Sequence, residues 1–300
     1  MRGAYTSEVW RKRVVLALPW LWSGLFFLLP LAIVVKISLA EAQMSVPPYS
    51  DFLKRVDGGI VGINATLSNF HMLFSDALYL KAYLSSLKIA LVATALTLLL
   101  GYPMAYAIAR APVARRAILL VLVMLPFWTS FLVRIYAWMG LLRPSGIINA
   151  ALQALGLIDA PLIMLNTPGA VYLGIVYAYL PFMVLPLYAR LEKLDPALLE
   201  AAADLGAKPW RTFLAVTLPL SLPGVLAGSL LVFIPAVGEF VIPDLLGGPD
   251  TLMIGKVLWN EFFSNRDWPM SAAVTVVLLI VLVAPIMLFQ ALQARAEVRS

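Results

Sequence analysis

The sequence predicts an all-α integral membrane protein with six transmembrane helices in a single domain. The chain has 300 residues, of which 62% are hydrophobic and only 13% are charged, and its mean hydropathy is +0.92. A soluble domain carries about 25% charged residues. Apolar runs of about 20 residues, long enough to cross a bilayer as a helix, recur between polar connectors. These observations exclude a soluble globular fold.

Six apolar runs have the length of a membrane-crossing helix, and a polar tail of residues 1–13 precedes them. The first run is longer than the core of a secretory signal peptide and no small-residue cleavage site follows it, so we expect it to remain as the first span. Residues 14–300 then form one transmembrane domain. The expected spans cover residues 14–39, 84–109, 117–138, 169–187, 220–246 and 270–292.

Two connectors are long enough to contain structure of their own. The longer one, residues 41–83, contains proline and glycine pairs, and we expect a folded exterior loop with short helices. The other, residues 140–168, has turn signals near both ends. A short helix at the membrane surface is expected between them, over residues 147–157.

The distribution of Lys and Arg predicts the side of the membrane that each connector faces. With six spans both termini share one side, where 13 of the 22 Lys and Arg residues fall; six lie on the opposite side and three lie within spans. Short basic loops stay in the cytoplasm. We therefore expect both termini and the loop of residues 190–219 to be cytoplasmic. The same distribution explains the net charge of +6 without a nucleic-acid partner.

The cytoplasmic loop of residues 190–219 is predicted to fold as two short helices. Asp195 is a favourable N-cap, and Pro196 fits the first turn, where its missing N–H costs nothing. Gly206 supplies the left-handed residue that ends a helix, and Pro209 begins a second one. The apolar side chains of the first helix fall roughly on one face and its acids on another. Such a helix would present a ridge to something outside the lipid.

The spacing within this loop resembles the EAA signature of the membrane subunits of ATP-binding-cassette importers. Glu200-Ala201-Ala202 is followed after three residues by Gly206, and after nine more by Val-x-Leu-Pro at 216–219. The tripeptide alone is ordinary helix composition, whereas the whole spacing ahead of the penultimate span is specific. The alternative is a solvated amphipathic connector. The resemblance implies a coupling helix seated in a cleft of the ATPase subunit, with the coupling residues Leu198, Glu200, Ala201, Ala202, Asp204 and Gly206.

Further stretches are similar to the permease subunit of bacterial polyamine importers of the putrescine type, although spermidine-type permeases share many of them. The resemblance covers nearly the whole chain and implies a type I importer fold in the bacterial inner membrane, with residues 41–83 periplasmic. It also implies a second homologous permease, a dimer of ATPase subunits that bind ATP and magnesium, and a periplasmic polyamine-binding protein. The chain itself would bind no cofactor. The matching segments are 27–31, 36–41, 128–140, 176–186, 235–243, 245–250 and 261–269.

The ionisable residue Glu239 lies deep within the predicted fifth span. A charge at this depth costs about 2.5–3.5 kcal/mol on insertion scales, so it is a functional hypothesis by default. Pro235, Gly238 and Pro243 around it predict a locally broken helix. Free backbone carbonyls beside a carboxylate would suit a cation. The alternative is a structural carboxylate that pairs with Arg134 or with a polar group on a neighbouring helix.

Aromatic side chains in the third and fourth spans are candidates for the walls of a cation path, because their faces attract ammonium groups by about 0.5–2 kcal/mol each. Aromatic residues near the outer interface are also common as belt residues, so both interpretations stay open. An excess of acids in the exterior segments would attract a polycation, although the exclusion of bases from these loops produces the same imbalance. The candidates for the substrate path are Glu239, Trp128, Phe131, Tyr136, Tyr177, Tyr179 and Asp244.

No enzymatic or metal-binding pattern stands out. The chain has no Cys and one His, which excludes thiolate sites and a His cluster. The Gly255-Lys256 pair has Asp250 and Val257 where a phosphate-binding loop requires Gly and Ser or Thr. We therefore expect a transport subunit without catalytic residues or a metal. Two alternatives remain, an importer permease for another small organic cation or solute and an ion-driven carrier of polyamines or amino acids.

Overall fold

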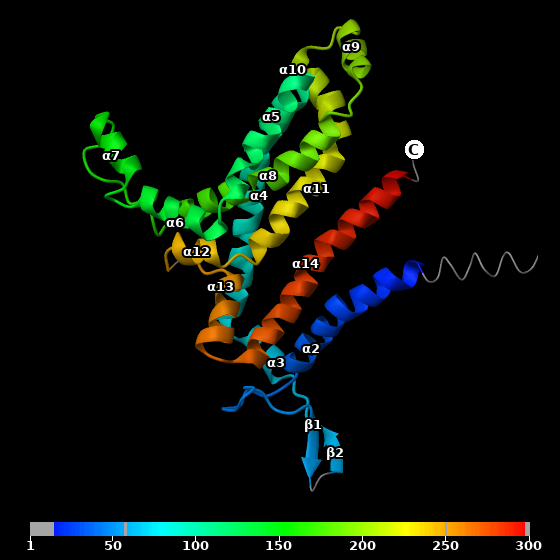
Figure 1. Cartoon of the computed structure of the whole chain (residues 1–300), viewed down its shortest axis with the longest axis vertical. Coiled ribbons are helices and arrows are strands. Elements are labelled where there is room, and N and C mark those ends of the chain that lie inside the picture. Colours follow the sequence, from blue (N-terminus) through cyan, green and yellow to red (C-terminus); the bar gives the residue numbers. More distant parts are fainter. Residues whose placement is uncertain (1–14, 57–58, 250, 298–300) are drawn as a thin grey trace, which may run out of the picture. The chain divides into compact units, whose positions relative to one another are not determined.

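The computed structural model describes residues 15–56, 59–249 and 251–297. Helices make up almost all of it (Figure 1), as the sequence predicts. The chain folds as two compact units. The first unit comprises residues 1–77 and 258–281, and the second comprises residues 78–257 and 282–300.

Four helices of the described chain are long and apolar enough to cross a bilayer, and a bent helix pair allows a fifth crossing. They correspond to the predicted first, second, fourth and fifth spans. The last helix, α14 (Trp268–Glu297), contributes a shorter apolar segment over Trp268–Val283, so the count of six spans stays a prediction. The four long helices are Val15–Ser38, Ala77–Arg110 (α4), Pro168–Leu191 (α8) and Pro209–Val237.

The predicted third span, residues 117–138, is not one straight helix. The chain leaves α5 (Val113–Met124) through the 3-10 turn η2 (Leu125–Trp128) and bends by 86° before α6 (Phe131–Leu142). Pro126 lies in the turn, and a proline cannot continue the hydrogen bonding of a helix. The prediction missed the bend because the apolar run continues through it without a polar residue.

The first unit combines the first span with exterior segments. Asn69 on the short helix α3 (Ser68–Ser75) donates hydrogen bonds to the carbonyls of Ser38, at 3.0 Å, and Ala40, at 2.8 Å, and so ties α3 to the end of the span. The loop of residues 41–83 differs from the prediction because it also contains an antiparallel β-hairpin, rich in β-branched residues that favour extended chain. The remaining elements are η1 (Gly24–Leu28), α2 (Leu29–Ser38), β1 (Leu53–Val56), β2 (Gly59–Ile63) and η4 (Asn260–Ser264).

The second unit is held together by the packing of α4, α8 and α11 (Leu218–Val237) around a shared apolar core. Met183 and Leu187 of α8 are fully buried in it, and a hydrogen bond of 2.8 Å joins the hydroxyls of Tyr102 on α4 and Ser221 on α11. The shorter elements of this unit are α7 (Ile147–Ala154), α9 (Pro196–Asp204), α10 (Pro209–Thr212), η3 (Phe213–Thr217), α12 (Val241–Leu245) and α13 (Ile254–Trp259), of which α13 ends in the first unit.

Two glycines of α11, Gly224 and Gly228, lie one turn apart where the helix meets α8. A Cβ atom added at Gly228 would lie 2.9 Å from Sδ and 3.1 Å from the carbonyl oxygen of Met183. Small residues with this spacing let helix backbones approach closely in membranes. The close packing of α8 and α11 therefore depends on the missing side chains.

We expect Gly228→Ala to destabilise the second unit by about 1–3 kcal/mol, because the new methyl group overpacks against the backbone of Met183. Thermal unfolding of the detergent-solubilised protein measures the loss. Gly140→Ala is the matched control, since an added Cβ at this helical position meets no atom within 4 Å. Equal unfolding temperatures for the two variants would contradict the packing argument.

Candidate functional site

The loop between α8 and α11 folds as the two short helices that the sequence predicts. The Asp195 carboxylate caps α9 by accepting a hydrogen bond of 2.9 Å from the Ala197 N–H. Gly206 has φ +77° and ends the helix in the left-handed region. The second short helix, α10, begins at Pro209. Each terminus is therefore set by a local signal within the loop.

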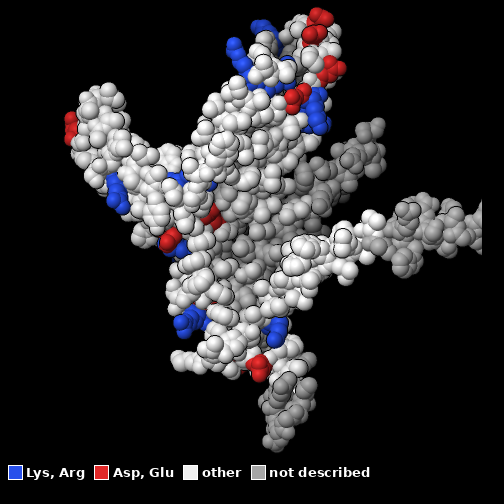
Figure 2. All heavy atoms as spheres, viewed as in Figure 1, with Lys and Arg blue, Asp and Glu red and all other residues white. Residues whose placement is uncertain are grey.

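No residue of α9 is fully buried and only Leu199 and Ala202 are half-buried, so the described part of the chain covers little of this helix. Leu198 is 47% exposed and Leu205 is 88% exposed, and Trp210 of α10 is 57% exposed. Figure 2 shows basic and acidic side chains gathered at this end of the second unit. Exposed apolar residues among charges are typical of a docking surface. The predicted coupling residues Glu200, Ala201, Asp204 and Gly206 are exposed, and Ala202 is half-buried.

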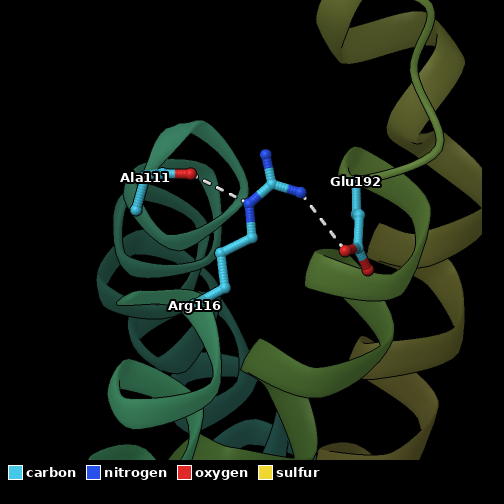
Figure 3. Close-up of polar contacts among 3 residues, drawn as sticks. All are labelled: Ala111, Arg116 and Glu192. Carbon is cyan, nitrogen blue, oxygen red and sulfur yellow. Dashed lines mark hydrogen bonds and ion pairs between the residues drawn. The ribbon is translucent and has the colours of Figure 1, made fainter. Parts of the chain in front are cut away.

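An ion pair ties the beginning of this loop to Arg116 in the first turn of α5 (Figure 3). The Arg116 Nη1 atom lies 3.2 Å from Oε1 of Glu192, the C-cap of α8, and Nε donates to the Ala111 carbonyl at 2.9 Å. Both charged side chains are partly exposed to solvent. Such a pair contributes less than about 1 kcal/mol, so it adds little stability, but it places the start of the loop in contact with α5.

A cavity of about 540 Å³ lies in the corner between η2 and α6. The rings of Phe127 and Phe182 meet edge to face with their centroids 5.2 Å apart. Phe182 is 38% exposed, so the cavity has an open side. Its walls are mostly apolar, and the residues that matter for its chemistry are Phe127, Phe131 and Arg134 from the bend, Tyr179 and Phe182 from α8, and Glu239 after α11.

Glu239 lies in the predicted break of the fifth span, between the end of α11 at Val237 and the start of α12 at Val241. Its Oε1 atom accepts hydrogen bonds from the N–H groups of residues 240, 241 and 242, at 3.2, 3.0 and 3.4 Å. Its Oε2 atom accepts a hydrogen bond of 2.5 Å from the Tyr179 hydroxyl. The residue is 7% exposed. It therefore caps α12 and ties the break to α8.

Arg134 also lines this cavity, and its charge is not paired with Glu239 in any ion pair among the described residues. The guanidinium carbon lies 4.8 Å from the centre of the Phe127 ring and 5.7 Å from that of Phe131. The residue is only 9% exposed. The predicted alternative in which Glu239 pairs with Arg134 is thus not found among the described residues. The other predicted alternative, a polar group on a neighbouring helix, corresponds to Tyr179 on α8.

Three of the predicted path residues come together at the cavity, namely Phe131, Tyr179 and Glu239. The others lie outside its walls. Trp128 is 78% exposed and Tyr136 is 51% exposed on the outer surface. The Tyr177 ring packs edge to face on Trp138 at 5.4 Å. Asp244 forms an ion pair of 3.0 Å with Lys256.

Phe127, Phe182 and Arg134 were not among the predicted residues of the substrate path, and Arg134 was considered only as a structural partner of Glu239. Hydropathy gives no signal for the two phenylalanines, since any span contains such residues. The signal for Arg134 was its charge within an apolar run, as for Glu239.

Long apolar helices, a mostly apolar cavity with few charges, and an exposed amphipathic helix at one end together define a membrane transport subunit. Residues 12–297 match the family described as the binding-protein-dependent transport system inner membrane component. The chain belongs to this family of permeases, which are inner-membrane transport components and not enzymes.

Relatives support this assignment over most of the chain. The spermidine/putrescine transport system permease protein PotB of Escherichia coli is 44% identical, with 87% of this chain and 90% of the relative covered. PotB of Haemophilus influenzae is 41% identical, with 88% of each covered. A bacterial ABC transporter involved in the import of alginate has the same fold, with a TM-score of 0.67, 18% identity and 96% of each chain covered.

Proposed function

We propose that this chain is the membrane-spanning subunit of an ATP-driven importer that carries a polyamine, putrescine first and spermidine as an alternative, into the cytoplasm. The observation that carries the proposal is the similarity to spermidine/putrescine permeases over nearly the whole chain. The cavity of the second unit is consistent with such a cargo, because it combines aromatic faces with a carboxylate. Partly desolvated aromatic rings attract an ammonium group by about 0.5–2 kcal/mol each.

The importer would contain three further components. A second, homologous permease would complete the path, a dimer of ATPase subunits would bind ATP and magnesium, and a periplasmic binding protein would deliver the polyamine. The relation to binding-protein-dependent systems supports this composition. The excess of Lys and Arg beside the termini supports an orientation with both termini and the loop of residues 190–219 in the cytoplasm.

The exposed loop helix α9 would couple the chain to its ATPase. Closure of the ATPase dimer on ATP would move α9 as a rigid body, with Glu200, Ala201 and Asp204 at the contact. The ion pair between Arg116 and Glu192 would carry this motion into α5. The bend after α5 would then shift relative to α8 and change access to the cavity, as in other hinge-type transitions.

Uptake into proteoliposomes tests the proposal directly. We expect vesicles that contain both permeases and the ATPase to accumulate radiolabelled putrescine only when ATP and the binding protein are present. Excess spermidine should compete with this uptake, and amino acids should not. Uptake driven by an ion gradient without ATP would instead indicate a secondary carrier. Competition by unrelated solutes, with no effect of spermidine, would indicate a permease for another cargo.

A further inference from the structure

Arg134 carries a positive charge whose hydrogen-bond donors are not satisfied by the described part of the chain. Its Nε and Nη1 atoms are buried and have no hydrogen-bond partner there. The guanidinium lies over the faces of Phe127 and Phe131, and a π-face attracts a cation without accepting its in-plane N–H donors. An arginine cannot discard its charge, because it is not deprotonated in proteins. A buried charge without hydrogen bonds is strongly destabilising, so the assembled protein requires an acceptor here.

Glu239 does not supply this acceptor in the conformation described, because no hydrogen bond or ion pair joins it to Arg134. Glu239 already accepts from three backbone N–H groups and from the Tyr179 hydroxyl. Among the residues that line the cavity it is the only acid. No described residue of the second unit therefore supplies the missing acceptor.

If the cargo is a polyamine, it cannot be the acceptor for Arg134, and this step rests on the proposed function. A polyamine presents ammonium groups, which donate hydrogen bonds and repel a guanidinium. An unpaired Arg134 would therefore oppose the passage of the cargo. An anion that pairs with Arg134 would remove this barrier as well as satisfy its donors.

We propose that Arg134 forms an ion pair with an Asp or Glu side chain of the second permease, which enters through the open side of the cavity. The cavity volume of about 540 Å³ accommodates such a side chain beside Phe127 and Phe131. The outer face of α6 carries Leu132, Val133 and Tyr136, which are 48%, 62% and 51% exposed and suit a helix–helix contact. Arginine is the favoured residue for interface ion pairs because its planar fork matches a carboxylate.

The experiment measures association of the second permease with this chain, without ATP or cargo. Arg134→Glu should lower the amount of second permease that co-purifies with the full-length chain by at least about tenfold, because two carboxylates would then meet in a buried site. Arg134→Met should lower it less, and Arg134→Lys least, since lysine keeps the charge but not the fork. Arg143→Met is the matched control, because it removes a charge from the exposed end of the same helix and should have no effect.

A charge exchange identifies the partner and protects the test against simple misfolding. In the Arg134→Glu background, each membrane-embedded Asp and Glu of the second permease is replaced in turn by Arg, and one exchange should restore co-purification. The same exchange in the wild-type background should reduce it. Unchanged association in both Arg134→Glu and Arg134→Met would overturn the proposal. The proposal would also be overturned if no exchange restored co-purification and if substitutions of Arg134 affected association only in nanodiscs that contain phosphatidylglycerol. That result would assign a lipid phosphate as the acceptor. A failure of polyamine uptake by the wild-type importer would count against the proposed function. The association experiment would still show whether Arg134 contacts the second permease, because it uses neither ATP nor cargo.

Discussion

Replacing Gly206 with valine is expected to leave the importer assembled in the membrane while each ATP hydrolysed drives much less uptake. Gly206 has φ +77°, and its N–H and that of Ala207 bond to the carbonyls of Ala203 and Ala202, at 2.8 and 3.0 Å. This is the Schellman arrangement that ends a helix. A Cβ atom at residue 206 would meet nothing within 4 Å, so the substitution acts through the backbone alone.

The size of the effect follows from the cost of the left-handed conformation. A residue with a side chain loses about 1–2 kcal/mol in this region relative to glycine, and a β-branched residue loses more. Such a penalty changes the population of the correctly ended helix by about 5- to 30-fold. The chain would then leave α9 in another direction, and a rigid contact with the ATPase would be lost. We expect the number of polyamines imported per ATP hydrolysed to fall by a similar factor.

The test of Gly206→Val compares ATPase activity and uptake in the same proteoliposomes. Gly156→Val is a matched control, because Gly156 has φ +67°, ends α7 with the same pair of hydrogen bonds and also has no atom within 4 Å of an added Cβ. Both variants carry the same backbone penalty, and only one lies in the loop. Normal coupling in Gly206→Val, or equal loss in both variants, would contradict the role assigned to α9.

The loop could be predicted in detail because local chemistry decides it. Asp195 and Gly206 act on backbone groups within four residues, so their effect is written in the adjacent sequence. The break at Glu239 was also predicted, because Pro235, Gly238 and Pro243 cluster around it and weaken the helical hydrogen bonding there. The hydrogen bond between Glu239 and Tyr179, 60 residues earlier, was not predicted. That contact depends on how α8 and α11 pack.

The bend before α6 and the surroundings of Arg134 show what hydropathy leaves out. A span prediction counts apolar residues, and Pro126 does not interrupt that count. Long basic side chains near the end of a span usually extend their charge toward the membrane interface. The bend instead places Arg134 between Phe127 and Phe131, with 9% of the residue exposed. A single residue near the middle of an apolar run thus decided which side chains line the cavity.

Two substitutions distinguish the electrostatic role of the Glu239 charge from its role as the N-terminal cap of α12. Glu239→Ala removes the acceptor of three backbone N–H groups at the start of α12 and of the Tyr179 hydroxyl. Each buried donor left without a partner costs about 1–3 kcal/mol. We expect this variant to unfold at a clearly lower temperature and to assemble poorly.

Glu239→Gln keeps a carbonyl oxygen for the backbone of α12 and turns an amide toward Tyr179, whose hydroxyl can accept as well as donate. The break should therefore persist, and the complex should assemble with nearly normal thermal stability. The negative charge in the cavity is lost, and a hydrogen bond to a charged group contributes about 1.5–3 kcal/mol. Because about 1.4 kcal/mol corresponds to a factor of ten, we expect polyamine uptake to fall by about 10- to 100-fold. Tyr179→Phe is the control that removes one hydrogen bond and leaves the charge in place. Uptake at the wild-type rate in Glu239→Gln would reduce Glu239 to a helix cap, because the variant preserves the cap and lacks only the charge.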